Sequence, residues 1–167
     1  TADLIKHGKL ELDKSRNANR IMTFHDSCNP ARGMGLLDEP RYIIENVCDN
    51  FYEMPPNTIR EQTFCCGSGS GLNAGENMEL RMAGALPRAN AVKYVHEKFG
   101  VNTLGTICAI DRATLTTLCE YWVPDVEVYG IHELVGNALI LPGEKRRTED
   151  LRFEPLPGVE PEEDEDE

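Results

Sequence analysis

The stretch 101–122, VNTLGTICAIDRATLTTLCEYW, carries one complete strand–loop–helix unit. Its first eight residues end at Cys108 and form a short run of β-branched and apolar residues, which is typical of a buried strand. Asp111 can cap the helix that follows. The apolar residues of that helix recur on one face, at Leu115, Leu118, Cys119 and Trp122. The stretch therefore predicts a strand that leads into a helix.

The same order recurs along the rest of the chain. Further strands are expected at 20–25, 60–64 and 126–129. Further helices are expected from Asp38 through Phe51, from 76 through 99 with an interruption or restart at Pro87, and from 131 through 141. This repeated alternation predicts an α/β domain with a mainly parallel sheet and alternating helices.

Four cysteines fall where the predicted strands end. Cys28 follows the first strand, Cys65 and Cys66 follow the second, and Cys108 ends the third. Parallel strands connected by right-handed crossovers end at the same edge of a sheet, and ligands bind at that edge. We therefore expect four thiols to gather at the carboxyl edge of the strands.

Four thiolates in one place suit an iron–sulfur cluster, because sulfur is a soft ligand that donates charge to iron. The neighbouring pair Cys65 and Cys66 rarely forms a bridge with itself, since disulfide geometry is demanding. Gly67 and Gly69 permit unusual backbone angles and let amide N–H groups approach sulfur atoms closely. They are therefore the candidate cofactor-binding glycines.

The two other cysteines and the overall composition further limit the possible sites and functions. Cys48 and Cys119 fall on apolar helix faces and are interpreted as small core residues. The formal net charge of −12 argues against binding to a nucleic-acid backbone, which needs clustered Lys and Arg. No apolar run approaches the roughly 20 residues that cross a bilayer, which favours a chain that is not itself membrane-spanning.

The predicted organisation has three parts. Residues 1–19 are expected to connect to upstream sequence, 20–143 to form the cysteine-rich domain, and 144–167 to be an acidic, disordered tail. The chain begins with Thr1, so we expect a piece of a longer polypeptide or a processed chain.

The spacing of the cysteines resembles a known pattern. The chain has 36 residues between Cys28 and Cys65, then Cys66, which Gly67 follows, and 41 residues between Cys66 and Cys108. This arrangement is similar to the CCG cysteine-rich domain of heterodisulfide reductases, of the HdrB and HdrD type, over about residues 20–142. The resemblance implies a 4Fe–4S cluster, of the noncubane type, that splits a disulfide, with Cys28, Cys65, Cys66 and Cys108 as ligands.

The fifth cysteine of that family pattern falls on Asp111 here. Three interpretations stay open: the aspartate oxygen is a harder fifth ligand, Asp111 only caps its helix and leaves one iron open to substrate sulfur, or the cluster is of the ordinary four-ligand type. His25 lies three residues before Cys28 and is the candidate catalytic residue, which would donate a proton to a leaving thiolate or hydrogen-bond to the cluster.

Within the family, the chain is most similar to the C-terminal region of DsrK, the iron–sulfur subunit of the membrane-bound DsrMKJOP complex. This resemblance implies that electrons come from quinol through a DsrM-like membrane haem subunit. It implies the trisulfide of a small DsrC-like sulfur-carrier protein as substrate, in dissimilatory sulfur metabolism. It also implies a cytoplasmic position, peripheral on the inner face of the cell membrane through partner subunits.

Two other kinds of protein remain as alternatives. A non-catalytic electron relay would hold a cluster without meeting a disulfide, and the absent fifth cysteine favours it. A structural metal module would use zinc, which also takes four thiolates, although the paired Cys-x-x-Cys knuckles typical of zinc sites are absent.

Overall fold

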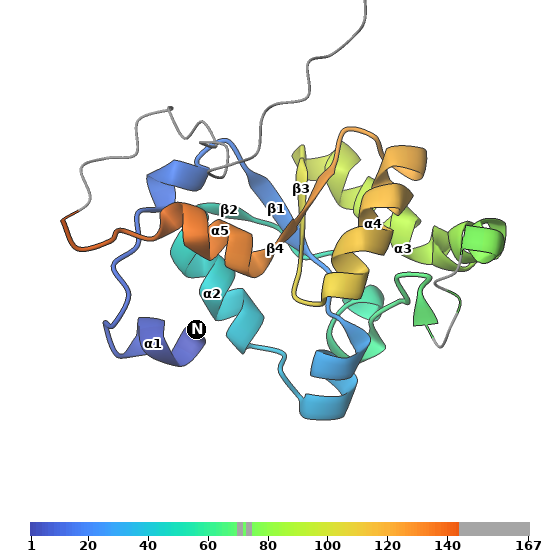
Figure 1. Ribbon diagram of the computed structural model, residues 1–167. Coiled ribbons are helices and arrows are strands. Elements are labelled where there is room, and N and C mark those ends of the chain that lie inside the picture. The colour runs from blue at the N-terminus through green and yellow to red at the C-terminus, as the bar shows by residue number, and fades with distance from the viewer. Residues whose placement is uncertain (70–71, 73–74, 144–167) are drawn as a thin grey trace, which may run out of the picture.

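The computed structural model describes residues 1–69, 72 and 75–143. At its centre is a four-stranded sheet in the order β2-β1-β3-β4, and all three neighbouring pairs are parallel (Figure 1). The strands are β1 (Ile21–Phe24), β2 (Asn50–Phe51), β3 (Thr103–Thr106) and β4 (Glu127–Gly130). The predicted α/β class with a parallel sheet is confirmed. The predicted acidic tail at 144–167 lies outside the described residues.

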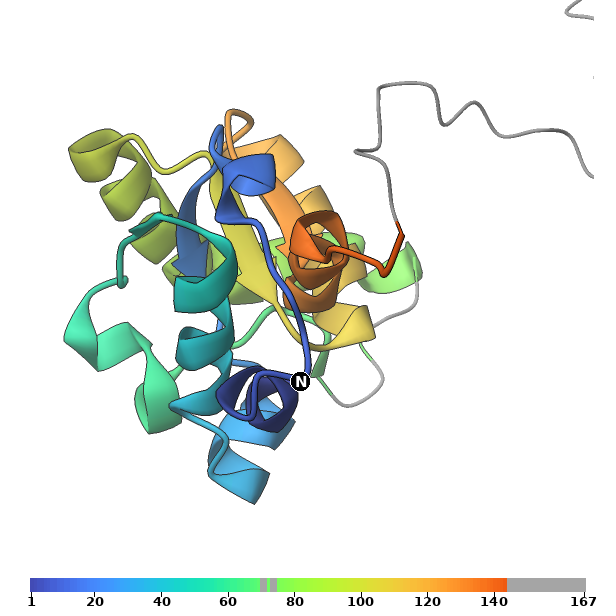
Figure 2. The ribbon, with the colours of Figure 1, turned by 90° about the vertical axis from the view of Figure 1, so that its left-hand side faces the viewer.

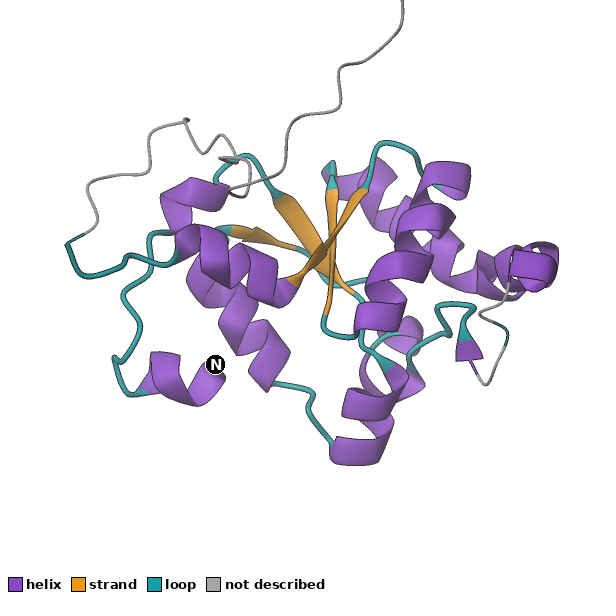
Figure 3. Cartoon of the chain, in the orientation of Figure 1, coloured by secondary structure: helices purple, strands orange, loops and turns teal. Residues whose placement is uncertain are grey.

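Helices cover both faces of the sheet (Figure 3). They are α1 (Ala2–Lys6), α2 (Glu39–Val47), α3 (Met78–Phe99), α4 (Ala109–Trp122) and α5 (Ile131–Ala138). Helices α3 and α4 pack with Leu104 and Val128 on one face, while α2 and α5 pack with Met22 and Phe24 on the other. Figure 2 shows β1, β3 and β4 side by side between these two layers. Alternate strand side chains thus supply both halves of the core.

Gly105 in β3 allows the second of these layers to pack closely against the sheet. A Cβ atom at this position would lie 3.0 Å from Met22 Cε and 3.5 Å from both Phe24 Cδ2 and Ile131 Cγ2. The absence of a side chain at Gly105 therefore makes room for three buried apolar groups.

The second strand predicted from the sequence, at 60–64, was wrong. Arg60–Gln62 form a short 3-10 turn, and the second strand is the two-residue β2, which follows α2 directly. Helix α2 accordingly ends at Val47 rather than at Phe51. Arg60 has a φ of +55° and donates its N–H to Asp26 Oδ2 at 2.7 Å. Side-chain hydrogen bonds, rather than strand pairing, organise this loop.

Two helix predictions also need correction. Helix α3 runs unbroken through Pro87, because packing of the residues on either side outweighs the hydrogen bond that proline cannot make. Asp111 does not cap α4: the helix begins at Ala109, and Cys108 occupies the N-cap position.

The segment 1–19 contains α1 and a turn at Lys14–Asn17. The Asn17 side chain is buried and donates to the carbonyl oxygens of Val47 and Leu134, each at 3.0 Å. Leu12 forms an isolated antiparallel bridge with Leu139. Among the described residues, no helix has the length and apolar character needed to cross a bilayer.

Candidate functional site

Two of the four candidate thiols follow neighbouring strands. Strand β1 ends at Phe24, and the next four residues lead to Cys28, which is exposed and begins the short helical turn Asn29–Gly33. Strand β3 ends at Thr106, and the half-buried Cys108 follows two residues later. Since β1 and β3 are parallel neighbours, both cysteines lie at the carboxyl edge of the sheet. In Figure 1 this edge is the lower end of β1 and β3.

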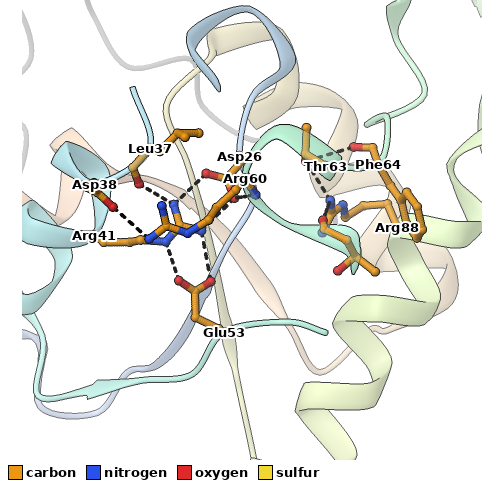
Figure 4. Close-up of polar contacts among 10 residues, drawn as sticks. Asp26, Leu37, Asp38, Arg41, Glu53, Arg60, Thr63, Phe64 and Arg88 are labelled. Atoms are coloured by element: carbon orange, nitrogen blue, oxygen red, sulfur yellow. Dashed lines mark hydrogen bonds and ion pairs between the residues drawn. The ribbon is translucent and has the colours of Figure 1, made fainter. Parts of the chain in front are cut away.

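The Cys65-Cys66 pair reaches this edge by a loop rather than by a strand. Arg32 fastens that loop to the segment after β1, because its Nε donates to Glu61 O at 2.8 Å and its Nη2 to Thr63 O at 2.7 Å. The Asp26 carboxylate accepts the Arg60 N–H, and Arg60 Nη2 lies 2.9 Å from Asp38 (Figure 4). These polar contacts thus hold the segment before Cys65 and Cys66 beside the loop that follows β1.

A buried ion pair between Arg41 and Asp26 also helps to hold the loop after β1 in place. Arg41 on α2 contacts Asp26 through Nη1 at 2.7 Å and Nη2 at 2.8 Å, and it also binds Glu53 (Figure 4). Burial opposes ionisation of Asp26, but the hydrogen bonds from Arg41 and the Arg60 amide outweigh it and hold the pKa of Asp26 below its ordinary 3.8. Asp26, Arg41 and Glu53 form what we call the acidic clamp.

Asp111 joins the three cysteine-bearing segments. Its side chain is buried, and its Oδ2 lies 3.5 Å from both His25 Nε2 and Thr106 Oγ1. The Cys66 thiol and Ser27, the residue before Cys28, also stabilise its charge. Burial would raise the pKa of Asp111, but these interactions, with that of His25 the largest, hold it at about 2.

The Cys66 thiol is held in its neutral form. Burial, followed by the hydrogen bond to Asp111, raises the pKa of Cys66 to about 12, while the backbone N–H of Ser68 acts in the opposite direction. Cys66 is thus a protonated thiol in the metal-free chain, and binding to a metal would release that proton.

The two candidate glycines differ in how strictly the fold requires them. Gly67 has a φ of +92°, and a Cβ there would lie 2.7 Å from Arg81 O and 2.9 Å from Ala85 Cβ on α3. Its N–H donates to Cys65 Sγ at 3.3 Å. A Cβ on Gly69 would lie 3.9 Å from Cys65 Sγ, an ordinary contact. The Cys-Cys-Gly turn therefore packs tightly on α3.

His25, the candidate catalytic residue, is buried behind Asp111. Burial lowers the pKa of His25, so the imidazole is neutral near pH 7, and its Nδ1 has no hydrogen-bond partner among the described residues. Its catalytic role stays a prediction.

The donor set fits a cluster better than a single ion. Within the part of the chain that the structure describes, no three His, Cys, Asp or Glu side chains lie close enough to hold one metal ion. A cluster has several irons, each bound by a different thiolate, so its ligands stand farther apart. The four edge cysteines are all free thiols, and Cys28 and Cys65 are exposed. These residues fit an iron–sulfur cluster.

Sequence reasoning missed one buried residue close to this edge. Arg88 on α3 has no exposed surface, and it contacts the loop that carries Cys65 (Figure 4). Its spacing from Val92 and Val95 places it on the buried face of the helix, and that spacing is the signal that could have identified it.

An α/β domain with free thiols at its carboxyl edge defines the class of protein. The family model for the CCG cysteine-rich domain matches residues 22–109, and the chain belongs to this family. Membership implies an iron–sulfur cluster.

Individual relatives give more specific information than the family model. The chain is 54% identical over 159 residues to the Hdr-like menaquinol oxidoreductase iron-sulfur subunit 2 of Archaeoglobus fulgidus, covering 93% of this chain and 29% of the relative. It is 51% identical over 153 residues to the Hdr-like menaquinol oxidoreductase iron-sulfur subunit of Archaeoglobus profundus, covering 92% and 28%.

A more distant relative is a subunit of the dihydromethanophenazine:CoB–CoM heterodisulfide reductase of Methanosarcina acetivorans. It is 30% identical over 139 residues, covering 82% of this chain and 32% of the relative. The chain thus spans about three tenths of the length of these curated relatives. No solved structure matches it. The relatives support an oxidoreductase role within a complex of several subunits.

Proposed function

We propose that this chain is the cluster-binding domain of an Hdr-like oxidoreductase and passes electrons to a sulfur–sulfur bond. The observation that carries the proposal is that Cys28 and Cys108 follow neighbouring parallel strands, with the loop of Cys65 and Cys66 attached beside them through Arg32. When bound there, a 4Fe–4S cluster would supply one-electron transfers to a bond that breaks by taking up two electrons.

The exposed and the buried residues of the site have different roles in this proposal. The exposed Cys28 and Cys65 lie on the side from which a large substrate can approach, whereas the buried Cys66 and Asp111 anchor the site to the core. Asp111 is already engaged by His25, Ser27 and Cys66, and this favours its holding the ligand loops together. In that arrangement Asp111 is not the fifth ligand, and one iron stays open to substrate sulfur.

The substrate and partners are the finer part of the proposal. The names of the relatives mention menaquinol and the CoB–CoM heterodisulfide, while the resemblance to DsrK implies a DsrC-like trisulfide. Menaquinol fits electrons that come from a reduced quinone, and the heterodisulfide and the trisulfide fit electrons that end at sulfur. We place the chain on the cytoplasmic face of the membrane, held by a DsrM-like haem subunit and other partners.

A single-turnover experiment tests the proposal. The cluster-loaded chain is reduced with titanium(III), freed of reductant, and mixed without oxygen with the CoB–CoM heterodisulfide or a DsrC-type protein trisulfide. We expect one sulfur–sulfur bond to break for every two electrons withdrawn, with the product thiols counted by labelling. The oxidised chain is the control.

If the reduced chain transfers no electrons to either substrate but still reduces a one-electron dye, the domain is an electron relay. That outcome would contradict disulfide cleavage by this domain but not its binding of a cluster.

A further inference from the structure

The side chain of Arg88 is a buried cation without a carboxylate partner. None of its surface is exposed, and in the described part of the chain no Asp or Glu oxygen lies within 4.0 Å of its guanidinium. Its Nε has no hydrogen-bond partner there. Arg41, by contrast, contacts two carboxylates in the acidic clamp. A buried charge that faces only neutral groups is costly to the folded state.

The groups that hold Arg88 belong to the loop before the cysteine pair. Its Nη2 donates to Thr58 O at 2.6 Å and to Thr63 Oγ1 at 2.9 Å, and its Nη1 lies 2.9 Å from Met54 Sδ. Its guanidinium also lies 5.8 Å from the centre of the Phe64 ring, directly before Cys65 (Figure 4). Arg88 is therefore fixed in orientation beside the Cys-Cys-Gly turn.

The acidic groups that act on the charge of Arg88 are Asp26, Asp111, Cys66 and Cys65. Asp26 is already paired with the cation Arg41, whereas Asp111 lies beside a neutral His25 and keeps its negative charge. The two thiols carry no charge while they are protonated, and they become anions when they bind a metal. Negative charge at the metal-bound cysteine pair would thus add to that of Asp111 as a counterpart of Arg88.

We propose that Arg88 is a positioning residue that compensates the negative charge of the metal-bound Cys65 and Cys66 and raises the reduction potential of the site. The inference rests on the proposed function, since it needs a cluster at this edge. Each electron that the site accepts adds negative charge, and a fixed cation in a medium of low dielectric constant favours the reduced form.

The test is the midpoint potential of the anaerobically loaded chain, followed by electron paramagnetic resonance in a redox titration. Arg88→Met removes the charge and retains much of the volume. We expect about a tenfold shift of the one-electron equilibrium toward the oxidised form, which corresponds to a potential lower by ~59 mV. Arg88→Lys keeps the charge and should restore most of the potential. Lys93→Met, an exposed position on the same helix, is the control for net charge and should leave the potential unchanged.

A second pair of variants serves if Arg88→Met does not fold. Thr63→Asp places a carboxylate against the Arg88 guanidinium and neutralises it, whereas Thr63→Asn has the same shape without the charge. Thr63→Asp should lower the potential and Thr63→Asn should not.

Unchanged potentials in cluster-loaded Arg88→Met or Thr63→Asp would overturn the inference and leave the proposed function intact. An equal shift in Arg88→Lys and Arg88→Met would overturn it too, since the effect would then be structural. A wild-type chain that binds no iron would overturn the inference and the proposed function together.

Discussion

The carboxylate of Asp111 occupies the position where the family pattern has a fifth cysteine. It is buried, ionised and in contact with residues from two other segments, among them Cys66 and His25. A neutral amide at this position keeps the volume but loses the charge that His25 and Cys66 bind. At the scale of single residues, Asp111 therefore decides whether the ligand loops hold together before any metal binds.

We predict that Asp111→Asn lowers the free energy of unfolding of the metal-free chain at pH 7 by about 1.5–3 kcal/mol, the range for hydrogen bonds to charged groups. Urea unfolding followed by circular dichroism measures it. Asp125→Asn, at an exposed position, is the control and should change little. An unchanged stability in Asp111→Asn would show that the carboxylate is not needed to join the loops.

The six cysteines should differ strongly in reactivity. Burial raises the pKa of Cys48 to about 11 and the pKa values of Cys66 and Cys119 to about 12, so at pH 8 only about a thousandth or less of each is thiolate. Cys28 and Cys65 are exposed. In the metal-free chain we expect iodoacetamide to label these two first, as mass spectrometry of the digested protein will show. Equal labelling rates at all six would contradict the described burial.

At the scale of elements, the turn after Cys66 is the most constrained part of the site. We predict that Gly67→Ala disrupts this turn at a cost of about 1–3 kcal/mol, because its backbone has a positive φ and a Cβ would collide with Arg81 O. Gly69→Ala is the matched control, since its added Cβ makes only an ordinary contact. The measurement is thermal unfolding of both variants, and equal midpoints would contradict the described turn.

The acidic clamp connects α2 to the loop that precedes the cysteine pair. Asp26→Asn leaves Arg41 partly uncompensated, and we expect a loss of about 3 kcal/mol at pH 7. The folded-state pKa of Asp26 lies below its ordinary 3.8, so its stabilisation is present above pH 3.8 and is lost as the pH falls toward the lower folded value. The difference between wild type and variant should therefore shrink below about pH 4. A constant difference down to about pH 2.5 would argue against an ionised Asp26.

How far sequence patterns succeed can be judged from particular elements. The strands at β1, β3 and β4 were predicted because their apolar, β-branched runs fill a buried sheet. The two-residue β2 has no such run, so its place could not be found. The loop with Arg60 has no periodicity either, because its shape depends on the side chains of Asp26 and Arg32.

In the site, too, some features could be predicted from local sequence patterns and others could not. The cysteines and glycines could be proposed as site residues because their residue types carry the chemistry. The link from Asp111 to Cys66 and the buried Arg88 depend on contacts between distant segments, which no local pattern encodes.

At the scale of the whole molecule, the parallel sheet brings the loops of Cys28 and Cys108 to one edge, and the contacts of Arg32 attach the loop of Cys65 and Cys66 beside them. The chain corresponds to about three tenths of its relatives' length. Under the proposed function, the exposed Cys28 and Cys65 mark the side of the domain that a partner or a substrate would approach.

The most direct test of the central claim is the iron and acid-labile sulfide content of anaerobically loaded protein. The account predicts about four irons and four sulfides per chain for wild type and for the core variants Cys48→Ala and Cys119→Ala. It predicts a clear loss in Cys28→Ser, Cys65→Ser, Cys66→Ser and Cys108→Ser. A wild-type chain without iron, or losses as large in the core variants as in the four edge variants, would contradict a cluster held at this edge of the sheet.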